Sequence, residues 1–317
     1  HWSSMDPKFS PMLDVARQQL TLVWEAFQAA LAQAVAASTD TQAPLPAVPV
    51  WADELRTARG EAAPEARTAA APVDITAAFN LPKEQHHNWK YIAFGPDGKL
   101  YVPFGAPCNI CALPSPEYAQ IRRYNPDGSG MEVVATGVRN SVGFDWHPAT
   151  KELWFSNHGR DWMGDDTPND TMHRMRKVGL NYGFPYCHEG KLPDTDVKKA
   201  NACGGVEPPV ALMGPHAASM GVMFYTGTMF PPEYRGVMFN ARKGSWNRTK
   251  KIGYDVVMVK ATADGKNGQV VPFMTGFMNE ADQSFWGRPA YLAQMKDGSV
   301  LVSDEQLGAI YRVSYGR

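Results

Sequence analysis

The stretch of sequence that decides the fold covers residues 139–187, RNSVGFDWHPATKELWFSNHGRDWMGDDTPNDTMHRMRKVGLNYGFPYC. It predicts a strand, then a loop rich in polar side chains, then a glycine-rich exit, with no room for a helix between them. This order is typical of one blade of a β-propeller, in which the loops between strands carry the functional groups. The stretch therefore predicts an all-β fold with a site in its loops.

Pairs of short strands joined by polar turns recur along the chain. Three copies occupy residues 94–102, 146–155 and 295–302, and a fourth version occupies residues 234–240. Pro-Asp-Gly and Lys-Asp-Gly supply residues that tolerate tight turns. Intervals of 53, 84 and 63 residues separate the equivalent positions, which are Val102, Phe155, Phe239 and Val302. A β-sandwich also repeats strand pairs, but seldom with so long a period, so the repeat favours a propeller.

The first 77 residues differ in kind from the rest. Ser10 and Pro11 form a helix start signal, and apolar residues recur at near-helical spacing as far as Ser38, which predicts a helix over residues 10–38. Residues 39–72 are rich in Ala and Pro and predict a linker. We therefore expect an N-terminal helical segment with a linker over residues 1–77 and a β domain over residues 78–317.

Composition excludes several classes of function. The 317 residues are 44% apolar, and 31 Lys and Arg face 32 Asp and Glu, so no net positive field is available to hold a nucleic acid. The longest apolar run falls short of the roughly 18 residues that span a bilayer. The composition therefore predicts a soluble globular protein, with nucleic acid an unlikely partner.

The four cysteines form two local groups, Cys108 with Cys111 and Cys187 with Cys203. Their even number and short spacing favour two disulfides, whereas a zinc site would require the groups to converge. Ala112 follows the CxxC motif where covalent haem attachment needs histidine. Disulfides indicate a periplasmic or secreted protein, although no signal peptide is visible at the amino terminus.

From about residue 79 to the carboxyl end, the chain resembles the glucose/sorbosone dehydrogenase family. These soluble quinoproteins oxidise sugars with pyrroloquinoline quinone (PQQ) held on a six-bladed propeller. The resemblance rests on the stretch quoted above, the Gly-Pro-Asp hairpin, residues 241–248 and residues 286–289. About 240 residues account for four or five blades, so either residues 1–77 fill the gap, the ring is open or completed by another subunit, or the sequence is truncated.

The resemblance implies that His87 is the catalytic base, because the family's histidine stands eight residues before the glycine of this turn, here Gly95. Histidine suits this role since its pKa lies near neutrality. From the residues alone, His86 and His87 would more often be an ordinary surface or core pair.

The resemblance also implies a set of cofactor ligands. PQQ carries three carboxylates, which call for cations. The family's Arg-Asn contact corresponds to Arg139 and Asn140. Lys243 and Arg288 match two further cationic positions, and His216 lies in a segment that touches the cofactor in relatives. Each of these side chains could instead be structural.

Calcium is the second cofactor that the resemblance implies, with a Lewis-acid role. The family's backbone carbonyl ligands correspond to Gly159 and Arg160. The acidic residues that follow in the same loop do not have the spacing of an EF-hand and would ordinarily solvate the loop.

One departure concerns the acid that supports the base in glucose dehydrogenases. The chain has Gly105-Ala106-Pro107-Cys108 there, which places it nearer the sorbosone-type branch and predicts a less basic His87. We therefore expect a PQQ- and calcium-dependent enzyme that oxidises an aldose or sugar aldehyde, passes electrons to a diffusible acceptor and can form a homo-oligomer. The alternatives are a calcium-dependent propeller lactonase and a non-catalytic, truncated propeller.

Overall fold

The computed structural model describes residues 74–82 and 84–316. Regular structure in this part of the chain is β, apart from two short 3-10 helices, η2 (Thr76–Phe79) and η3 (Pro232–Tyr234). The all-β prediction is confirmed for these residues. The predicted helix at residues 10–38 and the linker after it lie outside the described residues. None of the described helices has the length and apolar character needed to cross a bilayer.

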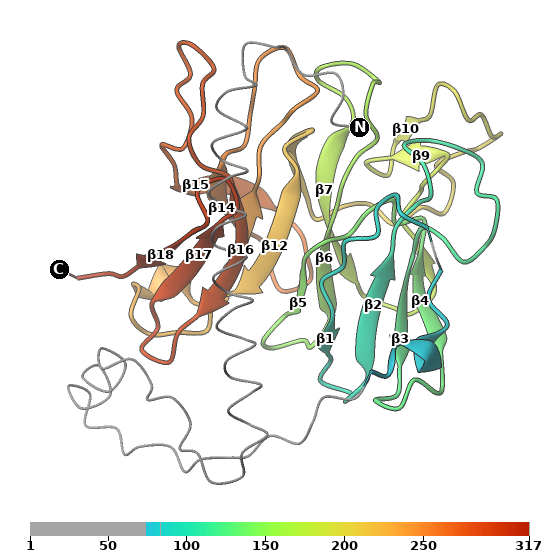
Figure 1. Cartoon of the computed structure of the whole chain (residues 1–317), viewed down its shortest axis with the longest axis horizontal. Helices are drawn as coiled ribbons and strands as arrows, with labels where there is room; N and C mark the ends of the chain where they lie inside the picture. Colours follow the sequence, from blue (N-terminus) through green and yellow to red (C-terminus); the bar gives the residue numbers. More distant parts are fainter. Residues whose placement is uncertain (1–73, 83, 317) are drawn as a thin grey trace, which may run out of the picture. The chain divides into compact units, whose positions relative to one another are not determined.

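Four antiparallel sheets follow one another along the chain (Figure 1). The first contains β1 (Ala93–Phe94), β2 (Leu100–Phe104), β3 (Gln120–Tyr124) and β4 (Glu132–Thr136), with β8 (Leu180–Asn181) added in parallel to β4. The second contains β5 (Phe144–Trp146), β6 (Leu153–Asn157), β7 (Asn169–Met175) and β11 (Ala211–Pro215). The third contains β12 (Ser219–Phe224), β13 (Met238–Arg242), β14 (Asp255–Lys260) and β15 (Gln269–Met274). The fourth contains β16 (Pro289–Gln294), β17 (Val300–Asp304) and β18 (Ala309–Val313), and a small hairpin joins β9 (Cys187–His188) to β10 (Leu192–Pro193).

The predicted repeat is confirmed by the position of its members. The four equivalent residues lie on the second strand of successive sheets: Val102 on β2, Phe155 on β6, Phe239 on β13 and Val302 on β17. Three of the predicted strand pairs are hairpins: β1 with β2, β5 with β6, and β16 with β17. The fourth version is wrong in detail. Residues 234–240 hold the end of η3 and the start of β13, and β13 pairs back to β12.

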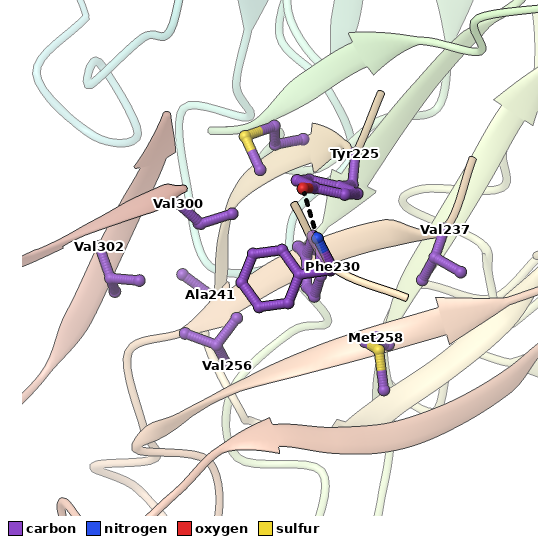
Figure 2. Close-up of a cluster of buried hydrophobic side chains, with 10 residues drawn as sticks. Tyr225, Phe230, Val237, Ala241, Val256, Met258, Val300 and Val302 are labelled. Carbon is purple, nitrogen blue, oxygen red and sulfur yellow. Dashed lines mark hydrogen bonds between the residues drawn. The ribbon is translucent and has the colours of Figure 1, made fainter. Parts of the chain in front are cut away.

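Apolar side chains fill the space between successive sheets. Phe155 and Ile121 belong to one cluster between the first and second sheets, and Trp154 joins Val257 between the second and third. Figure 2 shows the cluster between the third and fourth sheets, to which Val300 and Val302 of β17 and Val256 and Met258 of β14 belong. Because residues two apart on a strand share a face, one valine pair of β17 covers the third sheet.

The inner strands of the last three sheets approach one another at glycines. β12 packs against β5, β6 and β16. A Cβ added to Gly143, just before β5, would overlap the carbonyl oxygen of Met220, and one added to Gly221 would lie 2.8 Å from the carbonyl oxygen of Ala290. The Asn240 amide donates to the Gly221 carbonyl at 3.0 Å. Backbone therefore lies against backbone where the three sheets meet.

The first and fourth sheets are separated by a large apolar cavity. Its volume is about 1210 Å³, and its walls include Trp89, Tyr91 and Val102 on the side of the first sheet and Tyr291 and Leu292 from β16. No closed ring of sheets is present within residues 74–316, where four sheets take the place of the six blades that the resemblance implies.

Both predicted disulfides are present. Cys108 is bonded to Cys111 and Cys187 to Cys203, so no free cysteine remains, and the zinc alternative is wrong. The bridges fit a protein that matures outside the cytoplasm.

We expect Gly143→Ala to lower the free energy of unfolding by about 3 kcal/mol, the upper end of the usual overpacking cost, because backbone cannot yield as a side chain can. Gly308→Ala is the control: its Cβ would meet no atom within 4 Å at a φ of 62°, so only the cost of left-handed backbone, about 1–2 kcal/mol, applies. Urea denaturation of both variants checks this. Equal losses would mean that the glycine contact does not constrain the sheets.

Candidate active site

A polar cavity of about 400 Å³ collects most of the residues that the sequence singles out. Six parts of the chain form its wall: residues 85–87 before β1, 139–140 between β4 and β5, 158–161 after β6, Asp170 on β7, 216–218 before β12, and 246–247 after β13. His87, Arg139, Asn140, Gly159 and His216 line it together.

Three non-glycine residues of this wall have left-handed backbone. The φ angles are 53° at His87, 58° at His216 and 55° at Ala218. Such conformations cost roughly 1–3 kcal/mol each and persist only where the surroundings enforce them. The backbone at these three positions is therefore locally unfavourable, and the surrounding structure holds it in the conformation that places these residues in the cavity wall.

Two of the cavity's histidines are fully engaged by the protein. His158 Nε2 donates to the Ser219 carbonyl at 2.8 Å, so its Nδ1 accepts from the Asn140 amide at 3.3 Å. His216 Nε2 donates to the Gly164 carbonyl at 2.8 Å, and its Nδ1 accepts from Asn247 at 3.4 Å. A carbonyl oxygen can only accept, so the tautomer of each ring follows. Neither ring has a nitrogen left for a ligand.

His87 is arranged differently. Its Nδ1 donates to the Ala106 carbonyl at 2.8 Å, and Nε2 has no partner among the described residues. Burial, and then the nearby Arg139 guanidinium, lower the pKa of His87 to about 3 against the opposing effect of the Ala106 carbonyl. The ring is therefore neutral at ordinary pH with a free lone pair on Nε2. A carbonyl in place of a carboxylate at Nδ1 is consistent with the weaker basicity expected from the sequence.

Arg139 is held from two sides. The guanidinium is 4% exposed and bonds to Asp161 at 3.2 Å, and its Nε donates to the Asn109 carbonyl at 2.8 Å. The Asn109 side chain accepts from both Arg139 and the Asp161 backbone amide, each at 2.8 Å. Asn109 lies between Cys108 and Cys111, so the first disulfide loop positions this part of the site. Asn109 was not among the predicted site residues, although it lies inside the CxxC motif.

Asp170 joins two walls of the cavity. One carboxylate oxygen accepts from the Gly159 amide at 2.9 Å and the other from the Ser219 amide at 3.0 Å. Asp170 is buried and holds two backbone segments together, so it does not merely solvate the loop. In the described part of the chain, no group of three or more acidic, histidine or cysteine side chains could hold a metal.

The remaining predicted residues lie beside the cavity rather than in its lining. Lys243 bonds to Glu305 at 2.6 Å, and Arg288 lies 3.7 Å from the same carboxylate. The two are neighbours, since Arg288 Nε donates to the Lys243 carbonyl at 3.2 Å. The Arg160 guanidinium turns away and bonds to the buried Asp194 at 3.0 Å. If three cations were to balance the three carboxylates of PQQ, Arg139, Lys243 and Arg288 would have to line one pocket, but only Arg139 lines the cavity.

We expect Asp161→Asn to lower the free energy of unfolding by roughly 2–3 kcal/mol, somewhat less than for a fully buried pair, because it leaves the Arg139 charge buried without its counter-ion. Asp166→Asn is the matched control in the same loop: this acid bonds to Arg248 but is 82% exposed, so little change is expected. Urea denaturation measures both. A loss as small as that of the control would show that Asn109 alone compensates Arg139.

The lowered histidine pKa predicts a dependence of stability on pH. His87 and the buried His173 both have a pKa lowered from 6.5 to about 3. Between these values the unfolded chain binds protons that the folded protein does not, so stability is lost on acidification by at most about 1.4 kcal/mol per pH unit for each histidine. Above pH 6.5 neither histidine contributes to this dependence. In urea denaturation from pH 4 to 8, His87→Gln should have a shallower slope than the parent protein, and identical slopes would contradict the assignment.

Comparison with known proteins identifies relatives. The family model described as Glucose / Sorbosone dehydrogenase matches residues 52–243. An uncharacterized protein of Borreliella burgdorferi is 35% identical over 240 residues, which cover 74% of this chain and 63% of the relative. A second uncharacterized protein, from Synechocystis, is 30% identical over 117 residues, covering 36% of this chain and 26% of its own length. The chain thus spans less than two thirds of each relative.

Solved structures share the fold at lower identity. The calcium structure of a Trichoderma reesei carbohydrate-active enzyme of family AA12 is 18% identical with a TM-score of 0.57, covering 70% of this chain and 66% of its own. The holo form of the pyranose dehydrogenase PQQ domain from Coprinopsis cinerea is 19% identical with a TM-score of 0.53, covering 70% and 69%.

Proposed function

Because the chain belongs to the glucose/sorbosone dehydrogenase family, we propose that it is a quinoprotein that oxidises an aldose or a sorbosone-like sugar aldehyde, with His87 as the general base. The observation that carries the proposal is the free Nε2 of His87 in a cavity where His158 and His216 use both ring nitrogens. The proposal includes a six-bladed propeller, of which the four described sheets would form part.

The residues present fit a PQQ site in part. Arg139 and Asn140 would hold a carboxylate from the cavity wall, and Lys243 after β13 and Arg288 before β16 would add cations from neighbouring loops. The buried Oδ1 atom of Asn247, which lines the cavity, lacks a hydrogen-bond donor among the described residues.

Calcium fits the charge of the same cavity. Its wall carries two carboxylates, Asp161 and Asp170, against the single guanidinium of Arg139. A divalent cation would offset that excess beside an anionic cofactor. The backbone carbonyls of Gly159 and Arg160 accept no hydrogen bond from the described residues and are the ligands we propose. When bound, PQQ supplies the acceptor for the substrate hydride, and Ca²⁺ polarises the quinone oxygen.

The role of His87 follows from its hydrogen bond. Nε2 would take the proton of the substrate hydroxyl at the carbon to be oxidised, while Nδ1 continues to donate to the Ala106 carbonyl as the ring becomes charged. Gly105 permits this position, because a Cβ on it would lie 2.9 Å from the His87 carbonyl oxygen and would overlap the His87 side chain.

The test is dye reduction by the full chain after addition of PQQ and Ca²⁺, with a panel of aldoses and sugar aldehydes. We expect His87→Gln to lower kcat by roughly 10²–10⁴-fold, the usual contribution of a general base, while PQQ still quenches tryptophan fluorescence. The control is His147→Gln, a histidine outside the cavity whose Nδ1 accepts from the Ala149 and Thr150 amides.

Two results would count against the proposal. Near-normal turnover by His87→Gln would assign the base to another group. No dye reduction with any substrate, together with no fluorescence quenching by PQQ, would discard the dehydrogenase and leave a lactonase or a binding protein to be tested.

A further inference from the structure

Two tryptophans stand exposed at the rim of the polar cavity. Trp246, which lines the cavity, is 63% exposed, and Trp162 is 67% exposed. Their ring centroids lie 5.3 Å apart with the planes at 84°. They come from different loops, one after β6 and the other after β13. The pair therefore offers a face and an edge to a molecule that enters the cavity.

The loops that carry these rings are fixed by polar contacts next to each ring. Asn247 donates to Asp161 at 2.8 Å, Arg248 Nε donates to the Asp165 carbonyl at 2.8 Å, and the Thr249 amide donates to the Asp165 carboxylate at 3.1 Å. The backbone of Trp162 is left-handed, with a φ of 65°. These contacts hold two large apolar surfaces in water, where burying them would be favourable.

Pyranose rings suit such a surface. The C–H groups on one face of the sugar are apolar and pack on the electron-rich face of an aromatic ring, while the hydroxyls at the rim stay in water. Next to the two rings, the Arg248 guanidinium is already paired with Asp166 and is not available to a sugar carboxylate or sulfate. The chemistry of the rim thus indicates neutral sugar units.

We propose that Trp162 and Trp246 form a subsite for the outer units of a neutral oligosaccharide whose reducing end lies at His87. This inference rests on the proposed function and specifies its substrate class, an oligosaccharide rather than a free monosaccharide. No bond is formed or broken at the subsite; its contribution is affinity and orientation.

Direct binding tests the subsite without turnover. The probe is a β-1,4-linked glucotetraose reduced to its alditol, which lacks an oxidisable reducing end, titrated calorimetrically into the full-length protein. We expect Trp246→Ala and Trp162→Ala each to weaken binding about tenfold, the loss of one stacking contact. Trp286→Ala is the matched control, since this tryptophan is 50% exposed but packs on Phe277 outside the cavity lining, and it should bind as the parent does.

Kinetics and refolding controls complete the test. In dye reduction, the KM for the unreduced tetrasaccharide should rise about tenfold more than the KM for glucose in Trp246→Ala, and Trp246→Tyr should restore most of the affinity. Equal urea midpoints verify that each variant folds.

The outcomes separate this inference from the proposed function. Failure of the parent protein to bind the alditol, or binding by Trp162→Ala and Trp246→Ala equal to that of Trp286→Ala, would overturn the subsite even if sugars are oxidised. Loss of alditol binding in both variants would support the subsite even if no dye is reduced, in which case only the proposed oxidation fails.

Discussion

The close approach of backbone to backbone at Gly143 and Gly221 is the constraint on which the rest depends. These glycines let the inner strands β5, β12 and β16 meet with no side chain between them. Apolar clusters can pack between sheets at several spacings, but a backbone contact fixes one. The strand ends, and hence the loops that leave them, are then placed relative to one another.

Polar contacts hold the loops of the candidate active site in fixed positions relative to these strands. Arg139 and Asn140 lie in the short connection between β4 and β5, and Ser219 begins β12. Asp170 binds the amides of both Gly159 and Ser219, which ties the loop after β6 to the start of the third sheet. A buried carboxylate that accepts two backbone amides is well compensated. The cavity is thus an extension of the sheet packing rather than a separate loop structure.

The sequence predicted the repeat and much of the site because both depend on local order. Turn residues and alternation set where each second strand falls, and Arg139, Asn140 and Gly159 lie at strand ends, which converge in this fold. The side chains of Lys243 and Arg288 lie outside the cavity lining, where both form ion pairs with Glu305. The ion-pair partner of a long, flexible lysine or arginine side chain cannot be predicted from the spacing of residues in the sequence.

Some site residues were not predicted because their importance depends on their neighbours in the folded protein rather than on their residue type. Asn109 matters only because the Cys108–Cys111 loop brings it against Arg139, and its position inside CxxC was a signal that could have been used. Trp162 and Trp246 have no periodic pattern to mark them. Their significance comes from exposure, which a sequence does not display.

The hydrogen-bond partners of the cavity histidines determine which ring nitrogen keeps a free lone pair. Three of the four histidine rings that line the cavity, those of His87, His158 and His216, each donate one N–H to a backbone carbonyl; the acceptors belong to Ala106, Ser219 and Gly164. Each ring therefore keeps one nitrogen protonated and one lone pair. Asn140 and Asn247 each donate an amide to such a lone pair, on His158 and His216 respectively. His87 has no such amide, so among these three rings its Nε2 is the nitrogen left to accept a proton from a substrate. The fourth histidine of the lining, His86, is exposed beside it.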